Sequence, residues 1–224
     1  MQRFQANTVA RARSESILAT NSVIRNTYML LSMTLLFSAF TAYVSLATGA
    51  FFPPMLGFLG AIGLQFATYA LRNSVWGIVT TFGFTGLLGY SLGPVLSMYL
   101  NLANGPQVVT AALGLTGAIF FGLSGYAMTT KKDFSYLGGF LFAGVMVAFL
   151  ASLLGFFVQI PALQLAISSA FVLLSAGWIL YETSQIIHGG ERNYVIATIS
   201  LYVQIYNLFV SLLHILGSLS GRND

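Results

Sequence analysis

The fold class is clearest in the segment YVIATISLYVQIYNLFVSLLHILG, which runs from Tyr194 to Gly217. It contains no Asp, Glu, Lys or Arg, and it is longer than the roughly 20 apolar residues that carry an α-helix across the hydrocarbon core of a bilayer. Six stretches upstream are also mainly apolar, although the second is shorter and the sixth contains Glu182. We therefore predict an all-α membrane protein with seven transmembrane helices, over Thr27–Ala47, Pro54–Leu71, Val75–Tyr99, Gln107–Met128, Phe134–Phe157, Pro161–His188 and Tyr194–Gly217.

The composition indicates a surface that lipid covers. Hydrophobic residues make up 57% of the chain and charged residues only 6%, whereas a soluble domain carries about 25% charged residues. The net charge of +4 comes from nine scattered Lys and Arg residues, which do not form the basic patch that nucleic-acid binding requires. The sequence has no cysteine, which excludes disulfides, thiolate metal ligands and a cysteine nucleophile.

Basic residues fall on one side of this arrangement. Eight of them lie before the first stretch or in alternate loops: Arg3, Arg11, Arg13, Arg25, Arg72, Lys131, Lys132 and Arg192. The opposite loops, near Gly49, Asn104 and Gln159, contain no Lys or Arg. Because basic residues gather in cytoplasmic loops, we expect the N-terminus in the cytoplasm and the C-terminus outside. The second stretch is short and is the weakest of the seven, and this charge pattern requires it to cross.

Three regions are predicted along the chain. Residues 1–24 are polar, and we expect a mobile cytoplasmic tail there. Residues 25–218 are the seven-helix transmembrane domain, and residues 219–224 are a short C-terminal tail. A cleaved signal peptide is a poor alternative for the start, because the first apolar stretch reaches the full length of a span.

The seventh stretch carries polar residues along one face. They recur in steps of four and three: Ser200, Gln204, Asn207, Ser211, His214 and Ser218. Tyr202, Tyr206 and Phe209 fall on the opposite side. The sixth stretch has a thinner polar face, made of Gln164, Ser168, Ser175 and Glu182. Polar groups are costly against lipid, so we expect the two faces to meet each other or to share an interior. The two polar faces could serve interhelical hydrogen bonding or line a functional cavity, and the sequence leaves both interpretations open.

Glu182 is the one carboxylate expected inside, or at the edge of, a membrane-spanning stretch. A carboxylate at such a position indicates a functional site, because ionising it in apolar surroundings is expensive. The sequence leaves three possibilities for Glu182: it titrates near neutral pH, it pairs with Arg192 or Arg72, or it contacts cytoplasmic water. The candidate interior site that could sense pH consists of Glu182, Ser200, Gln204, Asn207 and His214. We expect His214 to bond to a neighbouring helix, and we expect no metal and no cofactor.

Glycines recur at helical spacing in the third and fourth stretches. They are Gly83, Gly86, Gly89 and Gly93, followed by Gly114, Gly117, Gly122 and Gly125. Small residues let helix backbones approach closely in lipid, so we predict close helix packing along both stretches. A conduction path or a hinge is the alternative.

Enzyme functions find little support in the sequence. It has no HExxH zinc motif and no phosphate-binding GxxxxGK[ST] motif. No pair of aspartates and no lysine lies within the apolar stretches, so an aspartyl intramembrane protease and a retinal Schiff base both lack their residues. We therefore expect a protein that is not an enzyme.

Three strings resemble the Bax inhibitor family of seven-helix membrane proteins. They are GLLGYSLGPVLSMYL (Gly86–Leu100), TTKKDFSYLGGFLFAG (Thr129–Gly144) and YETSQIIHGGERNYVIATISLYVQIYNLFVSLLHILG (Tyr181–Gly217). The resemblance extends from about Asn21 to Gly217. Within the family the chain is most similar to the bacterial YccA-type branch, whose members modulate the membrane protease FtsH.

The resemblance implies a bundle whose last helix is central and is wrapped by the other six. It also implies a regulatory protein of the bacterial inner membrane, which binds FtsH and its HflK/HflC partner complex. Such a protein restrains proteolysis of other membrane proteins and is itself a poor substrate. The protease would engage the N-terminal tail, which carries Arg3, Arg11 and Arg13.

Other branches of the family are described as pH-sensitive calcium leak channels. Their gate is a pair of aspartates, one near the end of the sixth helix and one in the seventh. The matching positions here are Glu182 and Gln204. Because glutamine cannot ionise, two carboxylates that share a proton cannot form. A pH-sensitive cation leak channel or transporter is therefore the alternative function.

Overall fold

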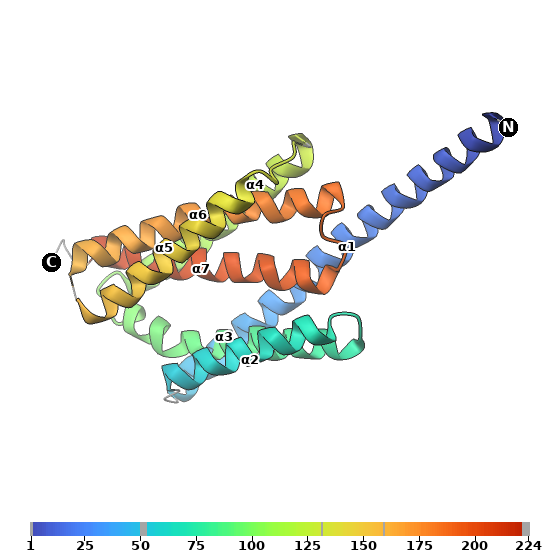
Figure 1. Cartoon of the computed structure of the whole chain (residues 1–224). Coiled ribbons are helices and arrows are strands. Elements are labelled where there is room, and N and C mark those ends of the chain that lie inside the picture. The colour runs from blue at the N-terminus through green and yellow to red at the C-terminus, as the bar shows by residue number, and fades with distance from the viewer. Residues whose placement is uncertain (1, 50–52, 131, 159, 221–224) are drawn as a thin grey trace.

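The computed structural model describes residues 2–49, 53–130, 132–158 and 160–220, and for residues 2–19, Pro54 and Phe156 it describes the backbone alone. These residues form seven α-helices and no strand (Figure 1). The helices are α1 (Gln2–Thr48), α2 (Pro54–Leu71), α3 (Val75–Leu100), α4 (Gly105–Thr130), α5 (Leu137–Phe157), α6 (Pro161–His188) and α7 (Tyr194–Ser220). The prediction of an all-α membrane protein is confirmed.

The ends of the helices follow from local chemistry. Helices α2 and α6 begin at Pro54 and Pro161, as predicted, because proline lacks only an N–H that the first helical turn leaves unpaired. Helix α6 ends where Gly189 takes a φ of 75°, a left-handed conformation that glycine adopts without strain. The ends of α3, α4, α5 and α7 lie within three residues of the predicted ones.

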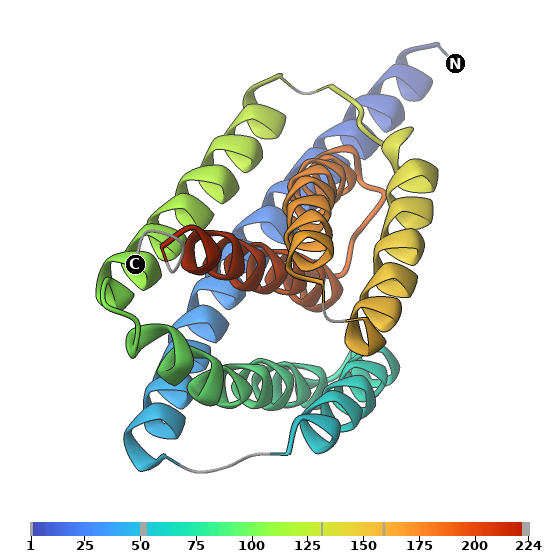
Figure 2. The same ribbon diagram turned by 90° about the vertical axis from the view of Figure 1, so that its left-hand side faces the viewer.

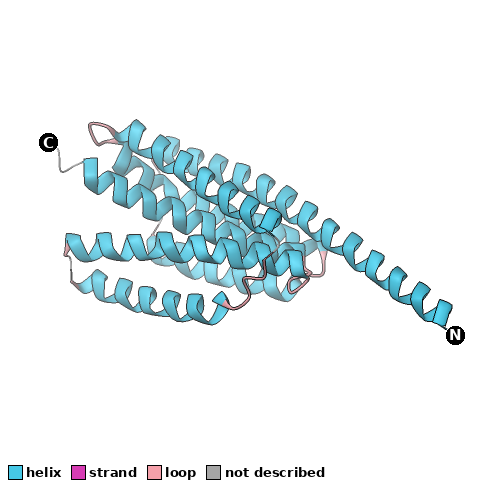
Figure 3. Cartoon of the chain, turned by 90° about the horizontal axis from the view of Figure 1, so that it is seen from above, coloured by secondary structure: helices cyan, strands magenta, loops and turns pink. Residues whose placement is uncertain are grey.

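Helix α1 differs most from the prediction, because it begins at Gln2 rather than near Thr27. Its part from Thr20 to Thr48 has the length and hydropathy of a span, and its N-terminal part projects away from the other helices (Figures 1 and 3). The physical reason is local, because residues 2–24 contain neither proline nor glycine to interrupt the helix. The mobility of this segment stays a prediction.

Six helices are long and apolar enough to cross a bilayer, and α2 is the exception. Its apolar part, Met55–Leu71, is shorter than a typical span. Helix α2 packs along α3 and presents exposed apolar side chains such as Phe58 and Phe66 on its other face. That it crosses the bilayer with the other six stays a prediction.

Helix α7 is the centre of the bundle, as the family resemblance implied. Its most apolar window is 67% buried, whereas the corresponding windows of the five other long helices are 11–39% buried. Figure 2 shows α7 enclosed by its neighbours, with α5 on the periphery. Among the described residues α7 contacts α1, α2, α3, α4 and α6 but not α5. The expectation that all six helices wrap α7 is therefore wrong for α5, because α6 lies between them.

The glycines of α3 and α4 have different environments. In α3, a Cβ added at Gly86 would meet the ring of Phe37, and one added at Gly93 would meet the side chain of Ser45, so both glycines press on α1. In α4, a Cβ at Gly114, Gly117, Gly122 or Gly125 would meet no atom within 4 Å. The predicted close packing is thus confirmed for α3 and wrong for α4, because these glycines of α4 do not face another helix.

The three loops that carry basic residues lie at one end of the bundle. The side-chain amide of Asn193, in the α6–α7 loop, donates to Arg72 O at 3.1 Å and to Asn73 Oδ1 at 2.9 Å in the α2–α3 loop. The α4–α5 loop reaches the same end, since Phe134 N donates to Ser184 Oγ near the end of α6 at 2.9 Å. This end therefore gathers the basic loops, as the charge pattern requires.

Candidate functional site

Glu182 and Ser200 bring the polar faces of α6 and α7 together near the end of the bundle that holds the basic loops. Ser200 Oγ donates to Glu182 Oε1 at 2.5 Å. Glu182 lies in the last two turns of α6, and Ser200 lies in the second turn of α7. The predicted contact between the two faces is therefore seen here. The role of this pair in sensing pH stays a prediction.

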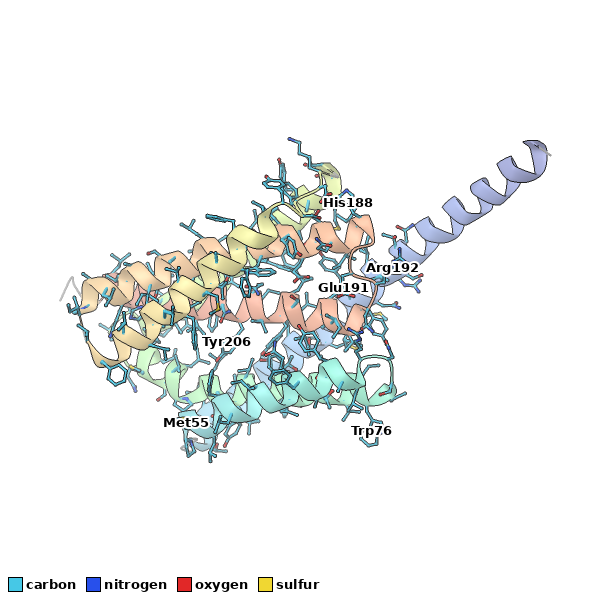
Figure 4. The ribbon with its side chains drawn as sticks, viewed as in Figure 1. Met55, Trp76, His188, Glu191, Arg192 and Tyr206 are labelled. Carbon is cyan, nitrogen blue, oxygen red and sulfur yellow. The ribbon has the colours of Figure 1, made fainter. Side chains whose placement is uncertain are left out.

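The loop between these helices fixes how they meet. Asn193 Oδ1 accepts from the backbone N–H groups of Val195 and Ile196 at 3.0 and 3.2 Å, which is the geometry of an N-cap for α7. Glu191 Oε1 in turn accepts from Asn193 N at 2.6 Å. Figure 4 shows Glu191 and Arg192 in this loop, at the end of the bundle from which α1 extends.

The described residues offer Glu182 no cationic partner. No ion pair joins it to Arg192 or Arg72 within the described part of the chain, and Arg192 Nε donates instead to Gly189 O at 3.1 Å. Among the described residues, the titratable side chains of Glu191 and Tyr69 lie near Glu182. Of the three states left open by the sequence, pairing with an arginine is thus not seen. A partly buried carboxylate that accepts from one hydroxyl and has no cationic partner is suited to binding a proton or a cation.

The other residues of the predicted site make no hydrogen bond to Glu182 within the described part of the chain. Gln204 and Asn207 are partly buried on α7, and their side chains make no hydrogen bond among the described residues. His214 lies near the opposite end of α7, where its Nδ1 is hydrogen-bonded to Ser168 Oγ on α6 at 2.8 Å. This bond is the expected one between His214 and a neighbouring helix. Within the described part of the chain no three potential metal-binding side chains come together.

A hydroxyl network that the sequence did not reveal lies on the other side of α7. Tyr202 is 1% exposed, and its hydroxyl donates to Thr85 O of α3 at 3.1 Å. Since that uses the phenolic proton, Ser38 Oγ of α1 donates to the Tyr202 oxygen, at 2.6 Å. The network ties α1, α3 and α7 together. The signal that could have revealed it is the run of Ser38, Thr41 and Ser45 along one face of α1.

Comparison with known proteins agrees with this architecture. Residues 20–221 match the model of the family described as Inhibitor of apoptosis-promoting Bax1. A protein of Pseudomonas aeruginosa is 53% identical over 224 residues, which cover 100% of this chain and 99% of the relative. A protein of Escherichia coli strain K12 named Modulator of FtsH protease YccA is 53% identical over 203 residues, which cover 90% of this chain and 92% of the relative. Its counterpart in Escherichia coli O6:H1, with the same identity and coverage, is named Inner membrane protein YccA.

Proposed function

The chain belongs to the Bax inhibitor family, and we propose that it binds and restrains an FtsH-type membrane protease as a multi-pass regulatory protein of the bacterial inner membrane. The proposed partners include the HflK/HflC complex. We propose further that the chain is itself a poor substrate of the protease. The observation that carries the proposal is the 53% identity with a named modulator of FtsH, which extends over 90% of this chain.

The projecting part of α1 supports the further proposal that the protease engages the N-terminus. At about 1.5 Å per residue, the helix before Thr20 extends about 27 Å beyond the spanning part. No other helix lies beside it (Figures 1 and 3). A helix without tertiary contacts is marginally stable, so a processive protease can unwind it at little cost. Arg3, Arg11 and Arg13 lie on this segment.

Crosslinking in native membranes tests the partnership. Tagged protein should capture the FtsH-type protease and HflK/HflC, and raising its level should lengthen the half-life of another membrane substrate of that protease. An unrelated multi-pass protein at the same level is the control for membrane crowding. Capture of other partners, with substrate half-lives unchanged, would contradict the proposal.

Deleting residues 2–11 tests the role of the tail separately. The shortened protein should be degraded more slowly in a pulse-chase, while it still captures the protease. Replacing Arg3, Arg11 and Arg13 by glutamine keeps the length of the helix and shows whether charge or length matters. An unchanged half-life after the deletion would mean that the protease does not start at this end.

The orientation of the chain is part of the proposal, with the N-terminus cytoplasmic and the C-terminus outside. The chain has no cysteine, so introduced cysteines are unique labels. Ser135→Cys, in the α4–α5 loop, should react with an impermeant reagent only from the cytoplasmic side, and Asn104→Cys only from the outside. Labelling of both from one side would rule out the alternation of seven spans.

The partly buried Glu182, which has no cationic partner among the described residues, favours a cation leak as a second candidate function. If it is the gate, Glu182→Gln should abolish the pH dependence of calcium flux in liposomes. Gln204→Asp should increase a flux that is small in the wild type, because it supplies the second carboxylate. Equal flux through the wild type and Gln204→Asp at every pH would show that the missing second acid does not limit conduction.

A further inference from the structure

A cavity of about 350 Å³ lies between α1, α3, α4 and α7, in the half of the bundle where α1 ends. Its wall on α1 extends from Leu35 to Leu46, and its wall on α7 includes Tyr206 and Phe209. Figure 4 shows Tyr206 projecting from α7 on the side away from α6. The volume falls at the lower end of the range for ligand pockets, which is about 300–1,000 Å³. The cavity is separate from the Glu182–Ser200 pair, and neither residue lines it.

The cavity opens toward lipid because α1 and α4 form a wedge. No backbone contact joins these two helices among the described residues. The wedge closes at one end, where the rings of Tyr28 on α1 and Phe120 on α4 lie 6.1 Å apart. At the open end the rim includes Tyr43, which is 67% exposed, and Leu113, which is 56% exposed. The lining is thus continuous with the surface that faces the bilayer.

The surface that lines the cavity is mainly apolar. It contains no charged side chain, and its hydroxyls from Ser38 and Tyr202 are hydrogen-bonded to each other. Thr116 Oγ1 donates to Ala112 O in its own helix at 2.7 Å. The hydroxyls of Tyr43 and Tyr206 have no hydrogen-bond partner among the described residues, so each is available to an oxygen of a ligand. An apolar chain with few oxygens suits such a site.

The length of the cavity matches one leaflet of the bilayer. From Leu35 to Leu46, α1 rises about 16 Å at about 1.5 Å per residue. Half of a hydrocarbon core of about 30 Å is about 15 Å. A single acyl chain that enters from the leaflet near the end of α1 would therefore extend along the cavity and stop near the Tyr28–Phe120 pair.

We propose that the wedge between α1 and α4 binds one acyl chain of a bilayer phospholipid. The acyl chain fills the space where α1 and α4 do not touch, and it joins the two helices through contacts with both. The site is independent of protease binding.

Quenching of tryptophan fluorescence by brominated lipid tests the proposal. Trp76→Phe and Trp178→Phe remove the native signals, and Phe209→Trp places a reporter in the cavity. Phe209 is 8% exposed, so lipid outside the bundle hardly reaches it. In vesicles of phosphatidylcholine brominated in mid-chain, the fluorescence of the Phe209→Trp reporter should fall at least about twofold. An occupied pocket contacts most of its ligand, so the bromine atoms of a bound acyl chain would lie against the reporter. Phe84→Trp is the matched control, since Phe84 is 2% exposed and does not line the cavity.

Filling the cavity provides the second test. Ala39→Phe, in the wall on α1, should remove the quenching of the Phe209→Trp reporter, whereas Ala118→Phe on the exposed face of α4 should leave it unchanged. Equal quenching of the Phe209→Trp and Phe84→Trp reporters would overturn the proposal, and so would quenching that survives Ala39→Phe.

If Ala39→Phe does not fold, mass spectrometry of the wild-type protein tests whether the wedge binds lipid. The protein is first purified with extensive detergent washing. Retention of one phospholipid per molecule would support the site. Retention of no lipid, or of a molecule without an acyl chain, would overturn it.

Discussion

The glycines of α3 and α4 have similar spacing in the sequence and opposite surroundings in the fold. Gly89 in α3 faces the backbone oxygen of Ser38 and the hydroxyl of Thr41 on α1, so closely that no side chain fits. Gly122 in α4 faces open space. Small residues permit helix backbones to approach closely in lipid, but they do not determine whether another helix packs against them. Helix α3 has α1 on its glycine face, whereas the glycine face of α4 is left toward the bilayer.

The same contrast extends to the polar residues of the inner and outer helices. On α7 and just before it, Tyr202 and Asn193 hold neighbouring elements through hydrogen bonds. On α4 and just before it, Tyr126 and Asn104 are exposed, and their side chains make no hydrogen bond among the described residues. Matched substitutions at these pairs should therefore have unequal effects.

Gly89→Leu should have the largest effect. The new side chain would overlap Ser38 and force α3 away from α1, at a cost of about 3 kcal/mol in the free energy of unfolding. Gly122→Leu adds the same side chain where there is room, and it should leave stability nearly unchanged. Thermal unfolding in detergent measures both variants. Similar melting temperatures for the two would mean that α3 does not press on α1.

Tyr202→Phe should have the next largest effect. It leaves the Thr85 carbonyl and the Ser38 hydroxyl without their partner in a buried site, which costs about 2 kcal/mol. Tyr126→Phe removes the same hydroxyl from a residue that is 47% exposed, so it should cost little. Unfolding in denaturant compares the two variants, and equal midpoints would contradict the buried network.

Asn193→Ala should have a smaller effect, because it removes the N-cap of α7 and the link to Asn73. We expect a loss of about 1 kcal/mol and faster hydrogen exchange in the first turn of α7. Asn104→Ala, just before α4, is the control and should change neither quantity. Unchanged exchange at Val195 and Ile196 in the Asn193 variant would argue against the cap.

Asp133, in the exposed loop after α4, should show the smallest effect. Hydrogen bonds from the Ser135 side chain and backbone N–H hold the pKa of the Asp133 carboxyl below its ordinary value. A lowered pKa means that these bonds stabilise the loop above the ordinary aspartate range and are lost as the pH falls through the folded-state pKa. A carboxyl-carbon NMR titration should place the midpoint below that of an unstructured aspartate, and Ser135→Ala should move it upward.

That the chain is helical and lies in a membrane follows from local features of its sequence. Long stretches without charge can satisfy their backbone groups in lipid only as helices, and Pro54, Pro161 and Gly189 mark helix ends by local stereochemistry. The sequence also predicted that the polar faces of α6 and α7 meet, since polar groups avoid lipid, and Ser200–Glu182 and His214–Ser168 are where they do.

Which faces of these helices are covered could not be predicted from the sequence and depends on how the helices pack. Helix α7 is buried on nearly every side, so Tyr202 is enclosed although it lies opposite the polar face that the sequence singled out. Helix α5 is more apolar than α7 but packs on the outside, against α6. In lipid, an apolar residue is equally well solvated by acyl chains and by other helices, so hydropathy does not distinguish an inner face from an outer one. Packing makes that choice through contacts between distant residues, such as Gly89 with Ser38.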